Sequence, residues 1–393
     1  MPGLPAFCLR PRDLRRGAVL TLAFLAAVAT GALTGCWDQE DGAAAAEIRT
    51  DLPASGAPRA AGTADRDAVA RAAAEAVAEG KSGKKAAQEV VSRSGDRWGT
   101  VYDQGEYAAF TEGLDGHWTG VGVWAGRAHD GVIKVDKVQP GSPAARAGLR
   151  AGDRLLSVDG HAVTGLAVTD VVALLRGTAG TPVVLNLSRD GADLTETVRR
   201  EQLRTEPVTV RQRPDGVTVI KVTSFTRGSG ERVKDAVRAA PAGAGVMLDL
   251  RGNPGGLVTE AVTAASAFLD GGLVATYDVR GEQRVLYAAP GGDTTRPLVA
   301  LVDGGTMSAA ELVTGALQDR GRAVAVGSRT FGKGSVQMPT ELPDGSVAEL
   351  TVGTYRTPAG RSLDGDGITP DVPAGERAEE RAVTVLGGLG VGP

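Results

Sequence analysis

Hydrophobic and polar residues alternate in two different ways along the chain, and the change falls near residue 204. From 217 to 326, short apolar runs are separated by longer stretches with helical periodicity. The runs 246–250 and 298–302 predict buried strands, and the stretches 230–240 and 308–318 predict helices. This order predicts an α/β domain, residues 204–385, with a mixed but largely parallel sheet.

Residues 116–203 have a different pattern, with short strands and many turns. The segment 132–135 alternates between apolar and polar residues and predicts a strand, and 183–187 predicts another. Asp159-Gly160 predicts a tight turn, and 168–175 a helix. The pattern therefore predicts a separate, β-rich domain inserted between the N-terminal segment and the α/β core.

The first 115 residues divide into three parts. Arg12, Arg15 and Arg16 precede an uncharged stretch from 17 to 37, so residues 1–35 are interpreted as an export signal or a membrane anchor. Residues 36–64 are rich in Ala, Gly and Pro and predict a flexible tether. Residues 65–115 predict a short N-terminal helical segment.

Composition excludes several classes of function. The net charge is −4 and there is no basic stripe, which argues against a nucleic-acid partner. Both cysteines, Cys8 and Cys36, lie in the first 36 residues, so the remaining chain has no disulfide, cysteine nucleophile or thiolate metal site. We expect no metal and no organic cofactor.

Ser308 and Lys333 are the candidates for chemistry. All three histidines lie before residue 162, so a serine nucleophile at 308 would need another base, and Ser–Lys pairs exist. A lysine becomes a base near neutral pH only when burial lowers its pKa from about 10.4. The alternative interpretation is that Ser308 is an ordinary N-cap and Lys333 a solvated surface residue.

Other residues could complete an acyl-transfer site. Backbone N–H groups of Gly255, Gly256 and Ala309 could donate to an oxyanion, because glycines leave room for a substrate and Ala309 follows the candidate nucleophile. Gln337 lies four residues after Lys333 and could orient its amine.

Several motifs in order resemble the C-terminal processing (tail-specific) peptidases. They are DLRGNPGGL at 249–257, SAAE at 308–311, GSRTFGKGSVQ at 327–337, YRTPAGR at 355–361 and GITPDV at 367–372. The resemblance implies that Ser308 is the nucleophile, Lys333 the general base and Gln337 its orienting residue. It also implies that Asp319 belongs to the family's catalytic set, with a structural role as an equal alternative.

One departure from the family pattern is visible. Gly305-Thr306-Met307 stand where the family usually has Gly-Ser-Ala, which affects the expected shape of a subsite.

The β-rich segment resembles a PDZ domain through GSPA at 141–144, AGL at 147–149 and GD at 152–153. PDZ domains add a peptide strand to a sheet edge and hold its C-terminal carboxylate on backbone amides. The resemblance implies that Gly120, Val121, Gly122 and Val123 form the carboxylate-binding loop; alternatively, the glycines only make a turn.

Leu33-Thr34-Gly35-Cys36 resembles the lipobox of bacterial lipoproteins. The resemblance implies a lipid on Cys36, which becomes the first residue of an exported protein on the outer face of the bacterial cytoplasmic membrane. An uncleaved membrane-spanning anchor and ordinary signal cleavage are the alternatives.

The combined expectation is a membrane-anchored serine endopeptidase that acts on protein or peptide substrates with apolar C-termini. A homo-oligomer or an activating partner is left open. One rival is a trypsin-like protease with PDZ domains, but Pro254 replaces the serine of that class's motif. The other rival is a non-catalytic, membrane-tethered peptide-binding protein.

Overall fold

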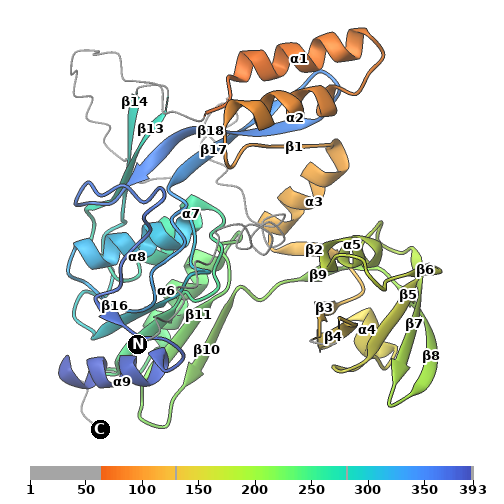
Figure 1. The fold of residues 1–393 in the computed structure, drawn as a ribbon. Coiled ribbons are helices and arrows are strands. Elements are labelled where there is room, and N and C mark those ends of the chain that lie inside the picture. Colours follow the sequence, from red (N-terminus) through yellow and green to blue (C-terminus); the bar gives the residue numbers. More distant parts are fainter. Residues whose placement is uncertain (1–62, 129–130, 280–281, 391–393) are drawn as a thin grey trace, which may run out of the picture. The chain divides into compact units, whose positions relative to one another are not determined.

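The computed structural model describes residues 63–128, 131–279 and 282–390. These residues form two compact units (Figure 1). One unit comprises 116–205, and the other combines 63–115 with the described residues from 206 onward. The second unit is therefore discontinuous in sequence, because the first is inserted into it.

The inserted unit is built around an antiparallel sheet. Strands β3 (Val123–Arg127), β4 (Ile133–Val138), β5 (Arg154–Val158), β7 (Pro182–Arg189) and β8 (Ala192–Arg199) follow one another in the sheet, and β6 (His161–Ala162) pairs with β5. Separately, β2 (His117–Gly120) pairs with β9 (Glu201–Arg204). Helices α4 (Pro143–Arg146) and α5 (Val168–Leu175) contribute Ala144 and Val171 to a core that includes Leu185.

A six-stranded sheet forms the centre of the second unit. Its order is β10 (Val208–Gln212), β11 (Thr218–Val222), β12 (Val246–Asp249), β15 (Leu298–Val302), β16 (Val324–Gly327) and β19 (Val372–Pro373). All neighbouring pairs are parallel except β10–β11. The prediction of a mixed, largely parallel sheet is confirmed.

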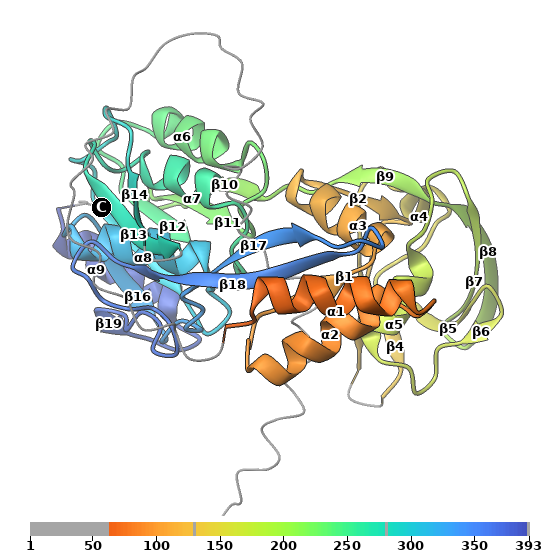
Figure 2. The ribbon, with the colours of Figure 1, turned by 90° about the horizontal axis from the view of Figure 1, so that it is seen from above.

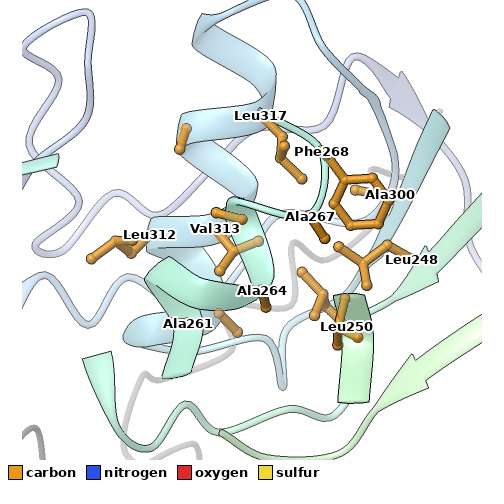
Figure 3. Close-up of a cluster of buried hydrophobic side chains, with 14 of the residues drawn as sticks. Leu248, Leu250, Ala261, Ala264, Ala267, Phe268, Ala300, Leu312, Val313 and Leu317 are labelled. Carbon is orange, nitrogen blue, oxygen red and sulfur yellow. The ribbon is translucent and has the colours of Figure 1, made fainter. Parts of the chain in front are cut away.

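Helices cover both faces of this sheet. Helices α6 (Ser229–Ala239), α7 (Val258–Ala265) and α8 (Ala309–Asp319) share one buried cluster with the strands, and Leu248, Phe268 and Val313 meet in its interior (Figure 3). Helix α9 (Ala378–Gly388) covers the other face through Ala382 and Leu386. This sandwich fixes the loops at the carboxyl ends of the strands, where ligands of parallel sheets bind.

A second sheet in this unit was not predicted from the sequence. Its strands are β1 (Thr100–Tyr102), β13 (Leu273–Val279), β14 (Glu282–Tyr287), β17 (Ser335–Glu341) and β18 (Val347–Arg356). Helices α1 (Arg66–Ala78) and α2 (Gly83–Ser94) lie along β17 and β18 (Figure 2) and bury Val69, Val91 and Leu350 together. Helix α3 (Gln104–Leu114) follows β1. The predicted N-terminal helical segment thus also contains a strand and packs into the larger unit.

The predicted signal or anchor, Cys36 and nearly all of the predicted tether lie outside the described residues. Within the described part of the chain, no helix has the length and apolar character needed to cross a membrane.

Candidate active site

Ser308 occupies an unusual backbone conformation at the start of α8. Its φ is 51°, and the residue is only 3% exposed. Among the described residues, the other non-glycine positions with positive φ are Asp159 and Asp190, both followed by glycine in turns. A strained serine persists only where its surroundings hold it in place, and such strain is concentrated at functional sites.

The carboxylate of Glu311 holds Ser308 and the lysine loop together. Its Oε2 accepts the N–H of Ser308 (2.9 Å) and the N–H of Lys333 (2.8 Å). Its Oε1 accepts the Gly332 N–H (2.7 Å) and the Thr330 hydroxyl (2.5 Å). Burial raises the pKa of Glu311, and these hydrogen bonds oppose the rise. The structure therefore brings the backbones of both candidate residues to one oxygen atom.

Glu311 lies in the SAAE motif at 308–311, but the sequence alone did not assign it a role. The sequence contained an indication of this role, because a glutamate three residues after a serine at a helix start is the pattern of a capping box. What the pattern does not reveal is the second set of donors, which comes from the loop at 330–333.

Lys333 is buried, as a general base requires. Only 1% of the residue is exposed, and its Nζ lies 5.0 Å from the centre of the Trp98 ring. The Trp98 ring in turn packs on Phe331, with centroids 5.8 Å apart. Burial lowers the pKa of Lys333 to about 8, although nearby carboxylates oppose the shift. A lysine with this pKa is partly neutral near pH 7–8 and fits the range of an effective base.

Gln337 is fully buried on β17 and belongs to a hydrogen-bonded chain. Its amide nitrogen donates to the hydroxyls of Ser335 (2.7 Å) and Thr351 (3.3 Å). Its Oε1 has no hydrogen-bond partner among the described residues. The Thr351 hydroxyl donates to Asp96 at 2.7 Å.

Asp96 and Trp98 connect the N-terminal segment to the site, and sequence reasoning missed both as site residues. Asp96 accepts the N–H of Trp98 (3.1 Å) and the N–H of Thr351 (2.9 Å). It thereby fixes the ring beneath Lys333 relative to β18. No spacing rule in the sequence links residue 96 to residue 333.

The three predicted oxyanion donors differ in the structure. The Gly255 N–H already donates to Asn253 Oδ1 at 2.8 Å. The N–H groups of Gly256 and Ala309 form no hydrogen bond with any described residue. A Cβ on Gly255 would lie 3.0 Å from the Ser308 Cβ, and one on Gly256 would lie 2.3 Å from the Phe225 carbonyl oxygen. The structure thus leaves Gly256 and Ala309 as the available donors, and Gly255 as a spacer against the serine.

Asp319 lies at the opposite end of α8 from Ser308, about 16 Å along the helix axis. Its carboxylate accepts the Ala359 N–H at 2.8 Å and pairs with Arg361. The structure does not bring Asp319 to Ser308 or Lys333.

The two unusual residues before the serine are both buried. Thr306 donates its hydroxyl to the Leu250 carbonyl at 2.9 Å, and Met307 is 4% exposed. Thr306 therefore supports the loop after β12.

The predicted carboxylate-binding loop, Gly120 to Val123, joins β2 to β3. The Val121 carbonyl accepts the Ala144 N–H (2.9 Å), which ties the loop to α4. Gly122 has φ 90°, and a Cβ there would lie 2.2 Å from the Ser142 Cβ. Glycine is required at 122 by backbone conformation and by this close approach.

The family model described as peptidase family S41 matches residues 216–374, and a PDZ domain model matches 134–189. The carboxy-terminal processing protease CtpA of Bacillus subtilis (strain 168) is 34% identical over 284 residues, which are 71% of this chain and 61% of that protein. The chain thus spans about three-fifths of the length of this relative.

Solved structures agree with these matches. The photosystem II D1 C-terminal processing protease is 31% identical, with a TM-score of 0.51, covering 78% of this chain and 86% of that one. A putative S41 protease from Bacteroides fragilis, 19% identical, shares the fold, with a TM-score of 0.50 over 74% of this chain and 81% of its own.

Proposed function

Since the chain belongs to the C-terminal processing peptidases of family S41, we propose that it is a serine endopeptidase with Ser308 as nucleophile and Lys333 as general base. One observation carries the proposal: a buried lysine with a pKa of about 8 is tied through Glu311 to a strained serine at a helix start. A buried base of this kind suits proton transfer from a serine hydroxyl.

The proposed reaction proceeds through an acyl-enzyme. Ser308 Oγ attacks the scissile carbonyl carbon while its proton passes to neutral Lys333, and the N–H groups of Gly256 and Ala309 donate to the resulting oxyanion. The N-terminus of α8 favours the same negative charge. The lysine then protonates the leaving amine. In the second half, neutral Lys333 takes a proton from the water that attacks the ester and returns it to Ser308 Oγ as the acid product leaves. Gln337 orients the amine of Lys333.

The inserted unit supplies the proposed selectivity. Its PDZ match favours capture of a free, apolar C-terminus at Gly120 to Val123, with cleavage upstream. Binding of the tail then supplies binding free energy far from the scissile bond, and this free energy can hold the substrate in position for cleavage. The proposed substrates are unfolded or tagged proteins.

The test is cleavage of a peptide with an apolar tail by Ser308→Ala and Lys333→Ala. Each change is expected to lower kcat by about 10⁴-fold, because each removes one half of the proton-transfer pair. Matched controls are Ser328→Ala and Lys85→Ala, which alter exposed residues of the same types. Near-normal turnover in either site variant would refute the mechanism. Tail binding without cleavage by the wild-type protein would instead favour the non-catalytic peptide-binding function.

We further propose that the protein is exported and anchored to the outer face of the cytoplasmic membrane through a lipid on Cys36. The lipobox-like run 33–36 supports this. Mass spectrometry of the mature N-terminus is the test, and a chain that begins at any residue other than 36 contradicts the proposal.

A further inference from the structure

Glu349 is a buried carboxylate to which the mechanism above assigns no role. It lies on β18 between Thr100 of β1 and Pro339 of β17, and it is 0% exposed. Neither of its carboxylate oxygens has a hydrogen-bond partner among the described residues. Buried carboxylates are normally paired or hydrogen-bonded, because desolvation of the charge is unfavourable. This exception therefore needs an explanation.

The direction of the side chain follows from the strand. Its neighbours Ala348 and Leu350 point into the cluster formed with α1 and α2. Since successive side chains of a strand point to opposite faces, Glu349 points to the other face. Thr351, two residues on, shares that face and contacts Gln337 and Asp96. Glu349 thus faces the same side of the sheet as the residues that surround Lys333.

We propose that the Glu349 carboxylate stabilises the charged form of Lys333 and so sets the pH above which this lysine works as a base. The inference rests on the proposed peptidase function and adds a residue that acts through Lys333 without touching the substrate.

The charges at the site support this assignment. Burial raises the pKa of Glu349 to about 7, and the charge of Lys333 opposes the rise. Burial lowers the pKa of Lys333 to about 8, and Glu349 is the strongest of the carboxylates that oppose this, ahead of Glu311 and Asp96. Glu349 is therefore mostly ionised in the range where Lys333 loses its proton.

The two tyrosines near Glu349 stay neutral in that range. Tyr102 of β1 and Tyr107 of α3 both have raised pKa values, mainly through burial, and that of Tyr102 reaches about 12. Glu341, on β17, is exposed, and its charge contributes to the raised pKa of Tyr107. Among these groups, Glu349 is the buried, unpaired charge that opposes neutralisation of Lys333.

The experiment measures kcat/KM on a tailed peptide between pH 5.5 and 9.5 for wild type, Glu349→Gln and Glu341→Gln. Removal of the buried charge is expected to move the midpoint of the acid limb to lower pH by about one unit. Near pH 7.5, where Glu349 of the wild type is mostly ionised, Glu349→Gln is then about three times faster than wild type, and the two rates converge at lower pH because the wild-type carboxyl becomes protonated there. The control Glu341→Gln removes an exposed carboxylate from the neighbouring strand and should leave the midpoint unchanged.

A midpoint that stays in place or rises in Glu349→Gln overturns the inference, and so does an equal loss of rate at every pH. Glu349→Met repeats the test if the glutamine variant does not fold. Failure of the proposed function is recognised separately, because Ser308→Ala or Lys333→Ala would then keep its activity.

A readout independent of activity is the unfolding free energy as a function of pH. The folded pKa of Glu349 lies above that of an unfolded glutamate, so its favourable contribution is present below about pH 4.3 and is lost as the pH rises through about 7. Wild type should therefore lose stability relative to Glu349→Gln over this interval. Parallel curves for the two proteins would contradict a buried, titrating carboxylate at 349.

Discussion

Two buried glutamates in this site have opposite surroundings. Glu311 receives four hydrogen bonds, whereas neither oxygen of Glu349 receives one from a described residue. A saturated carboxylate fixes geometry, because moving it would leave several donors unpaired in a buried place. An unpaired carboxylate acts mainly through its charge. At the scale of single residues, geometry and electrostatics are thus supplied by different side chains.

Glu311→Gln is expected to loosen the geometry. An amide cannot accept all four donors as an anion does, so we expect a loss of about 2–4 kcal/mol in unfolding free energy. We also expect a lower kcat with little change in KM, because Ser308 and Lys333 no longer share one acceptor. Denaturant unfolding and steady-state kinetics measure the two effects.

The matched control for this change is Glu260→Gln. Glu260 also accepts two backbone N–H groups, from Gly228 and Gly230, at the start of α6. The Glu260→Gln variant should lose stability but keep the kcat of the wild type. A Glu311→Gln enzyme with wild-type kcat would show that the shared carboxylate is dispensable for catalysis.

At the scale of elements, the loop after β12 is shaped to approach the start of α8. Asn253 donates to the Val222 carbonyl (3.0 Å) and accepts the Gly255 N–H (2.8 Å), which turns the glycines toward Ser308. The Met307 N–H donates back to the Asn253 carbonyl at 2.9 Å. The two loops therefore form one rigid frame for the serine.

Comparison of Gly255→Ala with Gly252→Ala separates the effect of backbone strain, which both variants have, from the effect of a methyl group close to Ser308, which only Gly255→Ala has. Both glycines have positive φ, 101° and 67°, so alanine costs about 1–2 kcal/mol at either position. A methyl group at 252 meets nothing within 4 Å, whereas at 255 it lies 3.0 Å from the Ser308 Cβ. We expect a larger loss of unfolding free energy for Gly255→Ala than for Gly252→Ala, because crowding adds to the strain, and a much lower kcat for Gly255→Ala alone. Equal kcat values for the two variants would disprove the close-approach argument.

The elements were predictable to different degrees for a physical reason. Strands of the parallel sheet are covered on both faces, so 246–250 and 298–302 appear as continuous apolar runs. The sheet of β17 and β18 carries Gln337, Glu349 and Thr351 on a buried face, which conceals its strands in the hydropathy pattern. Ser308 and Lys333 were identifiable from residue type and from family likeness. The contacts of Lys333 with Trp98 were not, because they join segments far apart in the sequence.

At the scale of the whole molecule, one unit carries the proposed chemistry and the inserted unit the proposed tail recognition. We expect a tailed peptide with a free C-terminus to bind the full-length protein about 10- to 150-fold more tightly than its amidated form. The free carboxylate gains charge-assisted hydrogen bonds worth about 1.5–3 kcal/mol. Titration of both peptides into Ser308→Ala, which does not consume them, is the measurement.

The control is a pair of short peptides without the apolar tail, free and amidated, cleaved by the wild-type enzyme. These should be cleaved slowly and at similar rates. Equal affinity for the two tailed peptides would remove carboxylate recognition from the proposal, whatever the role of Ser308.

The pairing of β1 with β18 has a consequence for the newly made chain. Asp96 and Trp98 precede the inserted unit, but the strand that fixes them, β18, begins at residue 347. Contacts between such distant segments form late in folding, since a long loop must close first. A chain that emerges from the ribosome therefore contains both Ser308 and Lys333 before the lysine has its apolar cover. Until that cover forms, the ammonium stays solvated and charged. The order of synthesis thus delays the proposed reactive state until β18 has been made.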